Sequence, residues 1–157
     1  MIHLSDDGLR RLQLKIDALK KERVVLRGQR AEAYEMGGDG WHDNPEFEHI
    51  EAEEKRLSME IARLEREFQT ADIMRPADAR IIGMGSRVVV SFSDGSKKIF
   101  QIGDRYTANP NKGIISLESP LGKALCGAAV GDVRSYAVRG IEIVVIVESI
   151  EIVGSDI

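Results

Sequence analysis

Residues with metal-binding chemistry crowd into one short stretch, GGDGWHDNPEFEH, at residues 37–49. Its carboxylates are Asp39, Asp43, Glu46 and Glu48, its histidines are His42 and His49, and it holds the single tryptophan, Trp41. Carboxylates gathered near one point repel one another, and a hard cation such as Mg²⁺ relieves that repulsion without a complete protein cage. The stretch therefore predicts a partial Mg²⁺ site.

Turn chemistry alone accounts for part of this composition. Helix–helix turns favour Gly, Asp and Asn, and helix N-termini favour Asp, Asn and Glu. These preferences alone can account for Asp43, Asn44 and Glu46, with no role in binding or catalysis. A transition-metal site is the rival chemistry, because Glu46-x-x-His49 is a pair found in di-iron bundles. Two helices cannot supply the remaining ligands, so we expect no intrinsic metal site or cofactor.

Trp41 suggests a different role for the same stretch. It lies in a connection that no core of this chain can bury, and an exposed tryptophan at a protruding turn is typical of a contact with a partner. We therefore predict that Trp41, together with the neighbouring His42, binds a partner.

The segments on either side of this stretch have a coiled-coil pattern. Positions at 3-4 spacing carry mostly apolar residues over residues 9–33 and again over residues 47–71. Arg23, Arg30 and Glu54 interrupt the seam, and polar residues at core positions can fix the register of a coiled coil. The pattern predicts two long helices.

Start and stop signals agree with these helices. Ser5 can cap the first helix, glycines follow it, and Asn44 and Pro45 can begin the second. Since the connection is short, the helices must be antiparallel. We predict a coiled-coil hairpin over residues 1–75, with an acidic tip at residues 38–46.

The first helix is rich in basic residues and the second in glutamates. The basic face comprises Lys15, Lys20, Arg23, Arg27 and Arg30. One interpretation is ion pairing between the helices. The other is a basic face that follows nucleic acid.

The second half of the chain changes to strand-like patterns. Alternating and β-branched runs, separated by turn signals such as SDGS and RG, predict antiparallel strands. One short helix is expected after Ser119, with Pro120 at its first position. The sequence thus predicts an α+β protein, with a small antiparallel β domain over residues 76–157.

Composition excludes several classes of protein. One cysteine, Cys126, cannot form an internal disulfide, and a net charge of −4 gives no argument for non-specific nucleic-acid binding. The N-terminus lacks a signal-peptide pattern, and the longest apolar run, IVVIV at residues 143–147, is far too short to span a membrane. We expect a cytoplasmic protein with no membrane partner.

Two segments carry a resemblance to a known family. They are the tip, with GD at residues 38–39 and DNPEF at residues 43–47, and ISLESPLGKALCGAAVGDV at residues 115–133. Together with the two-part organisation, they make nearly the whole chain similar to the bacterial Gre factors, the GreA/GreB transcript cleavage factors of RNA polymerase.

This resemblance implies a function. A Gre factor inserts its coiled coil into the secondary channel of bacterial RNA polymerase, where tip acids help to hold a second Mg²⁺ and the polymerase cleaves the 3′ end of backtracked RNA. By position, the catalytic acids lent to the polymerase are Asp39, Asp43 and Glu46, with Asp39 and Asp43 sharing the metal. The factor would not itself be an enzyme.

The resemblance also implies contacts and a fold for the second half. The β domain would be FKBP-like and dock on the polymerase, with Ser119 and Pro120 near the contact. Phe47 stands where the family has Tyr at the tip, and is expected to contact the partner too. We expect a monomer, with the polymerase and the nascent RNA 3′ end as its partners.

Two departures from the family pattern keep alternatives open. The loop is one residue longer between Asp39 and Asp43, and Asp43 replaces a Glu that is one methylene longer. A misplacement of about 1 Å can cost about 100-fold in rate. A channel-binding inhibitor without cleavage activity is therefore one alternative, and an FKBP-like prolyl isomerase or chaperone is another.

Overall fold

The computed structural model describes residues 2–36, 44–74 and 78–153. Contacts divide the chain into two units: Leu12–Ala71, called the hairpin unit below, and Ile2–Arg11 with Asp72–Ile157, called the β unit. The predicted domain boundary at residues 75–76 lies outside the described residues, as does most of the predicted tip.

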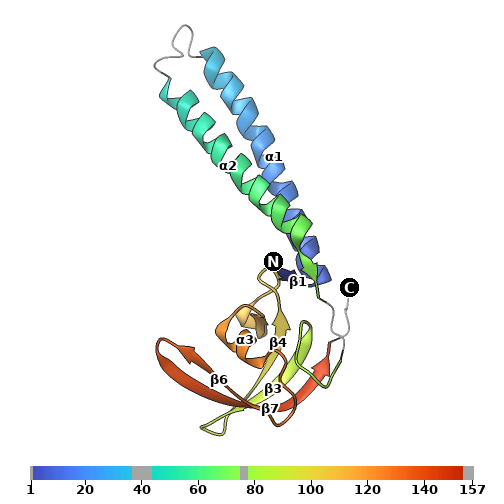
Figure 1. The fold of residues 1–157 in the computed structure, drawn as a ribbon. Coiled ribbons are helices and arrows are strands. Elements are labelled where there is room, and N and C mark those ends of the chain that lie inside the picture. Colours follow the sequence, from blue (N-terminus) through green and yellow to red (C-terminus); the bar gives the residue numbers. More distant parts are fainter. Residues whose placement is uncertain (1, 37–43, 75–77, 154–157) are drawn as a thin grey trace. The chain divides into compact units, whose positions relative to one another are not determined.

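Two long helices, α1 (Asp6–Met36) and α2 (Pro45–Thr70), make up the hairpin (Figure 1). Their cross-helix contacts run in opposite directions along the chain: Lys20 pairs with Glu65, whereas Arg30 pairs with Glu54. The helices are therefore antiparallel, as predicted. Among the residues of the hairpin unit whose burial the structure describes, the buried ones are Leu12, Ile16, Ala33, Ile50, Glu54, Ile61 and Leu64.

Both helices begin where their capping residues predict. The Ser5 hydroxyl accepts a hydrogen bond of 3.0 Å from Gly8 N at the start of α1. The Asn44 side chain accepts one of 3.0 Å from Phe47 N, and Pro45 follows at the first position of α2. Each cap satisfies an N–H group that has no partner inside its own helix.

The β unit is built on a five-stranded sheet in the order β5-β4-β3-β7-β6. Its elements are β3 (Ser86–Phe92), β4 (Lys97–Gly103), β5 (Ile114–Ser116), β6 (Val133–Val138), β7 (Ile141–Ile152), the 3-10 helix η1 (Pro110–Lys112) and α3 (Pro120–Leu125). Two short strands, β1 (His3–Leu4) and β2 (Asp72–Ile73), form a separate parallel pair that the sequence did not predict.

One strand pair corrects the expectation of an antiparallel sheet. β3 pairs antiparallel with β4 and β7, and β6 with β7, but β4 and β5 are parallel. Between them the chain makes a turn at Asp104–Thr107 and then passes through η1. These turns bring β5 back in the direction of β4, which a hairpin could not do.

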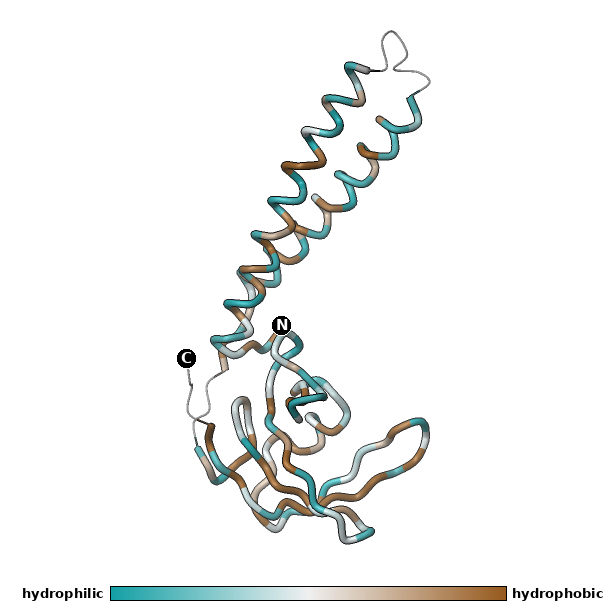
Figure 2. The backbone as a smooth tube through the Cα atoms, turned by 180° about the vertical axis from the view of Figure 1, so that it is seen from behind, coloured by the Kyte–Doolittle hydropathy of each residue, from teal (hydrophilic) through white to brown (hydrophobic). Residues whose placement is uncertain are grey.

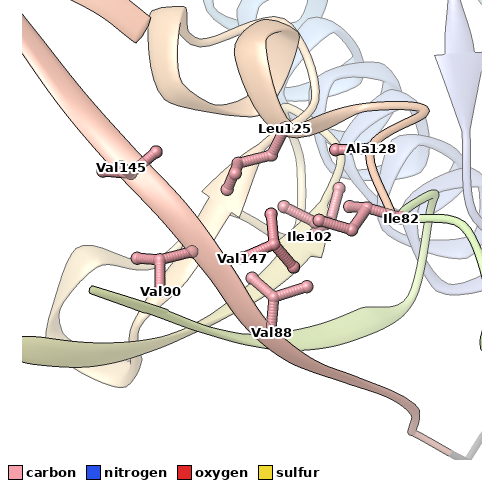
Figure 3. Packing of buried hydrophobic residues seen from close by; sticks show 8 residues of the cluster. All are labelled: Ile82, Val88, Val90, Ile102, Leu125, Ala128, Val145 and Val147. Atoms are coloured by element: carbon pink, nitrogen blue, oxygen red, sulfur yellow. The ribbon is translucent and has the colours of Figure 1, made fainter. Parts of the chain in front are cut away.

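The core of the β unit lies between the sheet and α3. Alternate residues of β3 are buried, including Val88 and Val90, because successive strand side chains point to opposite faces. They pack with Val145 and Val147 of β7 and with Leu125 of α3 (Figure 3). Figure 2 shows the same strands as hydrophobic stretches of the backbone.

Candidate functional site

Four of the predicted site residues lie in the connection between α1 and α2. Asp39, Trp41, His42 and Asp43 are outside the described residues, so their roles as catalytic acids, metal ligands or partner contacts stay predictions. The structure does describe the helix ends on both sides of this connection. These ends determine where the connection starts and stops.

Asn44 ties the two helix ends together. Its Nδ2 donates a hydrogen bond of 2.7 Å to the carbonyl oxygen of Ala33, while its Oδ1 accepts from Phe47 N. Ala33 belongs to the last turn of α1, where carbonyl groups lack partners within the helix. One side chain thus caps α2 and also satisfies the end of α1. The capping role was predictable from the sequence, but the contact with Ala33 was not.

An aromatic pair supports the same end of the hairpin. The rings of Tyr34 and Phe47 lie 5.6 Å apart, at an angle of 55°, which is typical of a favourable tilted pair. Ala33 and Ile50 are buried nearby in the chain. Phe47, predicted to contact a partner, is half-buried and contacts α1 in this structure.

Glu46 is the one predicted catalytic acid among the described residues. It is exposed in the first turn of α2, together with Glu48, where carboxylates complement the helix dipole. His49 Nε2 lies 3.7 Å from Glu53 Oε2 on the α2 surface. Within residues 2–36, 44–74 and 78–153, no group of three or more His, Cys, Asp or Glu residues is placed to hold a metal ion.

A polar layer crosses the hairpin. Glu54 is buried, and its Oε1 accepts a hydrogen bond of 2.8 Å from Arg27 Nε. Its Oε2 lies 2.6 Å from Arg30 Nη1. Nearby, Arg23 Nη1 lies 3.5 Å from Ser58 Oγ. Two of the three breaks in the heptad pattern, Arg30 and Glu54, therefore contact each other across the hairpin, as expected for residues that fix register, while Arg23 contacts Ser58.

The predicted basic face is largely turned toward α2. Lys20 adds an ion pair of 2.7 Å with Glu65, so four of its five residues contact α2 side chains. The fifth, Lys15, is exposed; its charge helps to lower the pKa of Glu60, although a hydrogen bond from Arg63 is the main cause. These contacts favour the interpretation of pairing between helices.

Ser119 and Pro120 begin α3 in the β unit. The Ser119 hydroxyl donates a hydrogen bond of 2.6 Å to Ser116 O and accepts one of 3.1 Å from Gly122 N. Pro120 is exposed at the first position of the helix. Ser119 therefore has a structural role as a cap, and Pro120 is accessible to a partner.

None of the described helices is long and apolar enough to cross a membrane. The hairpin helices are instead lined with charged side chains that form ion pairs.

Comparisons with known proteins give consistent results. Residues 77–152 match the family model "Transcription elongation factor, GreA/GreB, C-term". The chain is 31% identical over 134 residues to transcription elongation factor GreA of Thermosipho africanus, covering 84% of this chain and 85% of that protein. It is 30% identical to GreA of Thermosipho melanesiensis, covering 85% of each.

Among solved structures, the chain is similar to the GreA factor homolog 1 (Gfh1) protein of Thermus thermophilus. The sequence identity is 26%, the TM-score is 0.43, and the match covers 96% of this chain and 99% of that one.

Proposed function

Because this chain belongs to the GreA/GreB family of transcription elongation factors, we propose that it binds RNA polymerase and stimulates Mg²⁺-dependent cleavage of backtracked RNA. The observation that carries the proposal is the connection between α1 and α2. It contains Asp39 and Asp43, it is followed at once by Glu46, and it starts and ends on helix ends joined by Asn44.

The helices of the hairpin are long. α1 has 31 residues, which gives a length of roughly 45 Å at about 1.5 Å per residue. A helix pair of this length can carry the acidic connection through a narrow channel to a site that a compact domain could not enter. We infer that this is how the chain reaches the polymerase active site.

The chemistry follows from the side chains in the connection. Asp39 and Asp43 would supply oxygen ligands to a Mg²⁺ ion shared with the polymerase, and Glu46 would accept a proton from, or orient, the attacking water. When bound, the ion activates that water and stabilises charge on the phosphate in a two-metal arrangement. The donor set fits, because Mg²⁺ takes carboxylate oxygens and keeps several waters.

The described residues around the connection have a positioning role in this scheme. Asn44 links the end of α1 to the start of α2 by a hydrogen bond. The rings of Tyr34 on α1 and Phe47 on α2 form a second contact between the two helices. The Glu54 layer fixes how the helices align. Lent ligands need such support, because small misplacements are costly in rate.

The β unit supplies a docking surface in this proposal. Pro120 is exposed at the start of α3, and Ser119 holds this start in place through its hydrogen bonds to Ser116 and Gly122. A surface fixed in this way can bind a partner with little ordering of its own.

The test is a backtracked elongation complex with labelled RNA. We expect the wild-type chain to release short 3′ products only when Mg²⁺ is present. Asp39→Ala and Asp43→Ala should abolish these products while the variants still bind the polymerase. Trp41→Ala should instead weaken binding. A wild-type chain that binds tightly but releases no products would refute the cleavage activity.

A second candidate is inhibition of transcription through the same channel. It is favoured by the longer spacing between Asp39 and Asp43 and by the shorter side chain of Asp43, compared with the family pattern. It predicts slower nucleotide addition by the polymerase, and it predicts that Asp39→Ala changes this inhibition. If the chain binds and leaves both initiation and elongation rates unchanged, this candidate fails.

A further inference from the structure

β6 (Val133–Val138) lies at one edge of the five-stranded sheet (Figure 1). Among the strands that the structure describes, it pairs with β7 alone, in a register that runs from Val133↔Ile146 to Val138↔Ile141. The backbone N–H and C=O groups on its other side therefore have no strand partner within the described part of the chain. An open edge of this kind is a template for pairing with another chain.

The direction of the backbone groups alternates along β6. Val147 N donates a hydrogen bond of 3.0 Å to Asp132 O, so the residue just before β6 faces β7. Because hydrogen-bonded and non-hydrogen-bonded pairs alternate in an antiparallel ladder, the same holds for every second residue after it. The backbone groups of the residues between them point away from β7, and these residues are Val133, Ser135 and Ala137.

β6 lacks the features that usually block pairing at a sheet edge. Its sequence, VRSYAV, has no proline, glycine or lysine, and its register with β7 runs without a shift. Its one charged residue, Arg134, is half-buried on the core side of the sheet, opposite the buried Val145. The other edge strand, β5, has only three residues and directly follows η1, which contains Pro110 and Lys112. Of the two edges, β6 is therefore the one open to pairing.

The β6 strand is complementary to itself in an antiparallel pair of two copies. With the outward groups of both strands bonded to each other, Ser135 can stand opposite Ser135 of the partner subunit on a twofold axis. Val133 then lies opposite Ala137 of the partner subunit. Arg134 lies opposite Tyr136 of the partner subunit, which places a cation beside an aromatic ring. No two like charges of β6 are opposite each other in this register, so directly opposed residues do not repel.

Exposed apolar side chains lie along the same edge. Val133 is 57% exposed, and Ile146, its neighbour on β7, is 42% exposed. Val138 and Ile141 form a second exposed pair at the turn between β6 and β7. Pairing of two copies would shield part of this apolar surface from water, which favours association.

We propose that two copies of this chain associate through their β6 strands, so that the five-stranded sheets of both copies form one continuous sheet. The twofold axis passes beside Ser135. The partner at this edge is thus a second copy of the chain, and the proposal does not rest on binding to the polymerase. The monomer expected from the family resemblance is the competing outcome of the test.

The first measurement is the mass of the full chain by sedimentation equilibrium over a range of concentrations. We expect the wild type to change from one chain to two as the concentration rises. Ser135→Lys places two ammonium groups opposite each other at the axis, and should raise the dissociation constant by about 10-fold or more. Ser135→Glu should do the same with two carboxylates.

Ser149→Lys is the matched control. Ser149 is an exposed serine of β7 on the same face of the sheet, but it lies away from the β6 edge, opposite Val89 of β3. It should leave the dissociation constant unchanged. Packing of two sheets face to face would instead be weakened by this substitution. Equal melting temperatures for all variants show that the β unit remains folded.

Mixing the two charged variants tests the register itself. Ser135→Lys and Ser135→Glu should each be monomeric alone and form a dimer when mixed, because a lysine then faces a glutamate across the axis. Amide hydrogen exchange gives a direct readout, since the N–H groups of Val133, Ser135 and Ala137 should exchange more slowly in the dimer.

Three results would overturn the inference. The first is a wild type that stays monomeric at the highest soluble concentration. The second is a Ser149→Lys variant that weakens association as much as Ser135→Lys. The third is a mixture of the two Ser135 variants that does not form the dimer.

Discussion

Asn44 Nδ2 donates a hydrogen bond of 2.7 Å to the carbonyl oxygen of Ala33, so the cap of α2 also completes the last turn of α1. This single contact closes the hairpin directly beside the connection that carries Asp39 and Asp43. The Asn44 side chain thus contacts the described helix ends on both sides of that connection.

Asn44→Asp isolates this contact. Aspartate keeps the oxygen that accepts from Phe47 N but replaces the donor to Ala33 with a second acceptor. We expect a loss of stability of about 1–3 kcal/mol, because the Ala33 carbonyl loses its partner. Asn44→Ala should cost about 1 kcal/mol more through loss of the cap. Urea unfolding followed by helical circular dichroism measures both; an Asn44→Asp variant as stable as the wild type would show that the contact contributes nothing.

Glu54 should respond differently to two substitutions. Glu54→Ala removes the buried carboxylate from Arg27 and Arg30 and is expected to lower stability by about 1–3 kcal/mol. Glu54→Leu should be as stable as the wild type or more so, because a well-packed apolar residue often replaces a buried ion pair without loss. The measurement is the melting temperature of each variant. Equal losses in both variants would mean that the ion pairs themselves hold the hairpin together.

Asp7 provides a prediction about pH. Partial burial raises the pKa of its carboxyl, but hydrogen bonds from Arg10 and Arg11 and their charges outweigh this and lower the pKa below its ordinary value. A depressed folded-state pKa stabilises the protein above the unfolded-state value of about 3.9, and the effect disappears as the pH falls through the folded-state pKa.

The stability difference between the wild type and Asp7→Asn should therefore be present at neutral pH and vanish in acid. A carboxyl titration by nuclear magnetic resonance gives the pKa of Asp7 directly. In Arg10→Gln/Arg11→Gln, this pKa should rise. A wild-type Asp7 pKa at or above the ordinary value would contradict the role assigned to the two arginines.

Local signals in the sequence were sufficient to predict the helices and where they begin. Ser5, Asn44 and Ser119 were identified as caps because each is a small polar residue just before a helical pattern, and all three accept the expected backbone hydrogen bond. The heptad pattern also placed Glu54 at a core position. These features depend on neighbours within a few residues, which is why a single sequence reveals them.

Contacts between distant segments could not be predicted in this way. Asp104 accepts a hydrogen bond from Ser5, which is 99 positions away, and nothing near either residue indicates the other. The direction of β5 was also missed, because it depends on the turns at residues 104–112 rather than on the pattern of the strand. For the basic residues of α1, the sequence allowed either ion pairing with α2 or a face that follows nucleic acid. Their short distances to glutamates of α2 favour ion pairing.

The most direct test of the account is the rate of 3′ RNA cleavage in a backtracked complex, measured at saturating factor for the wild type and Asp39→Asn. At saturation the polymerase is fully occupied by either chain, so a difference in cleavage rate reflects the chemical step and not the affinity for the polymerase. We predict Mg²⁺-dependent cleavage by the wild type and a loss of about 100-fold or more in Asp39→Asn, as for the removal of a group that stabilises the transition state. Equal rates for the two chains, or no cleavage by either, would contradict the proposal that the hairpin lends carboxylates to the polymerase.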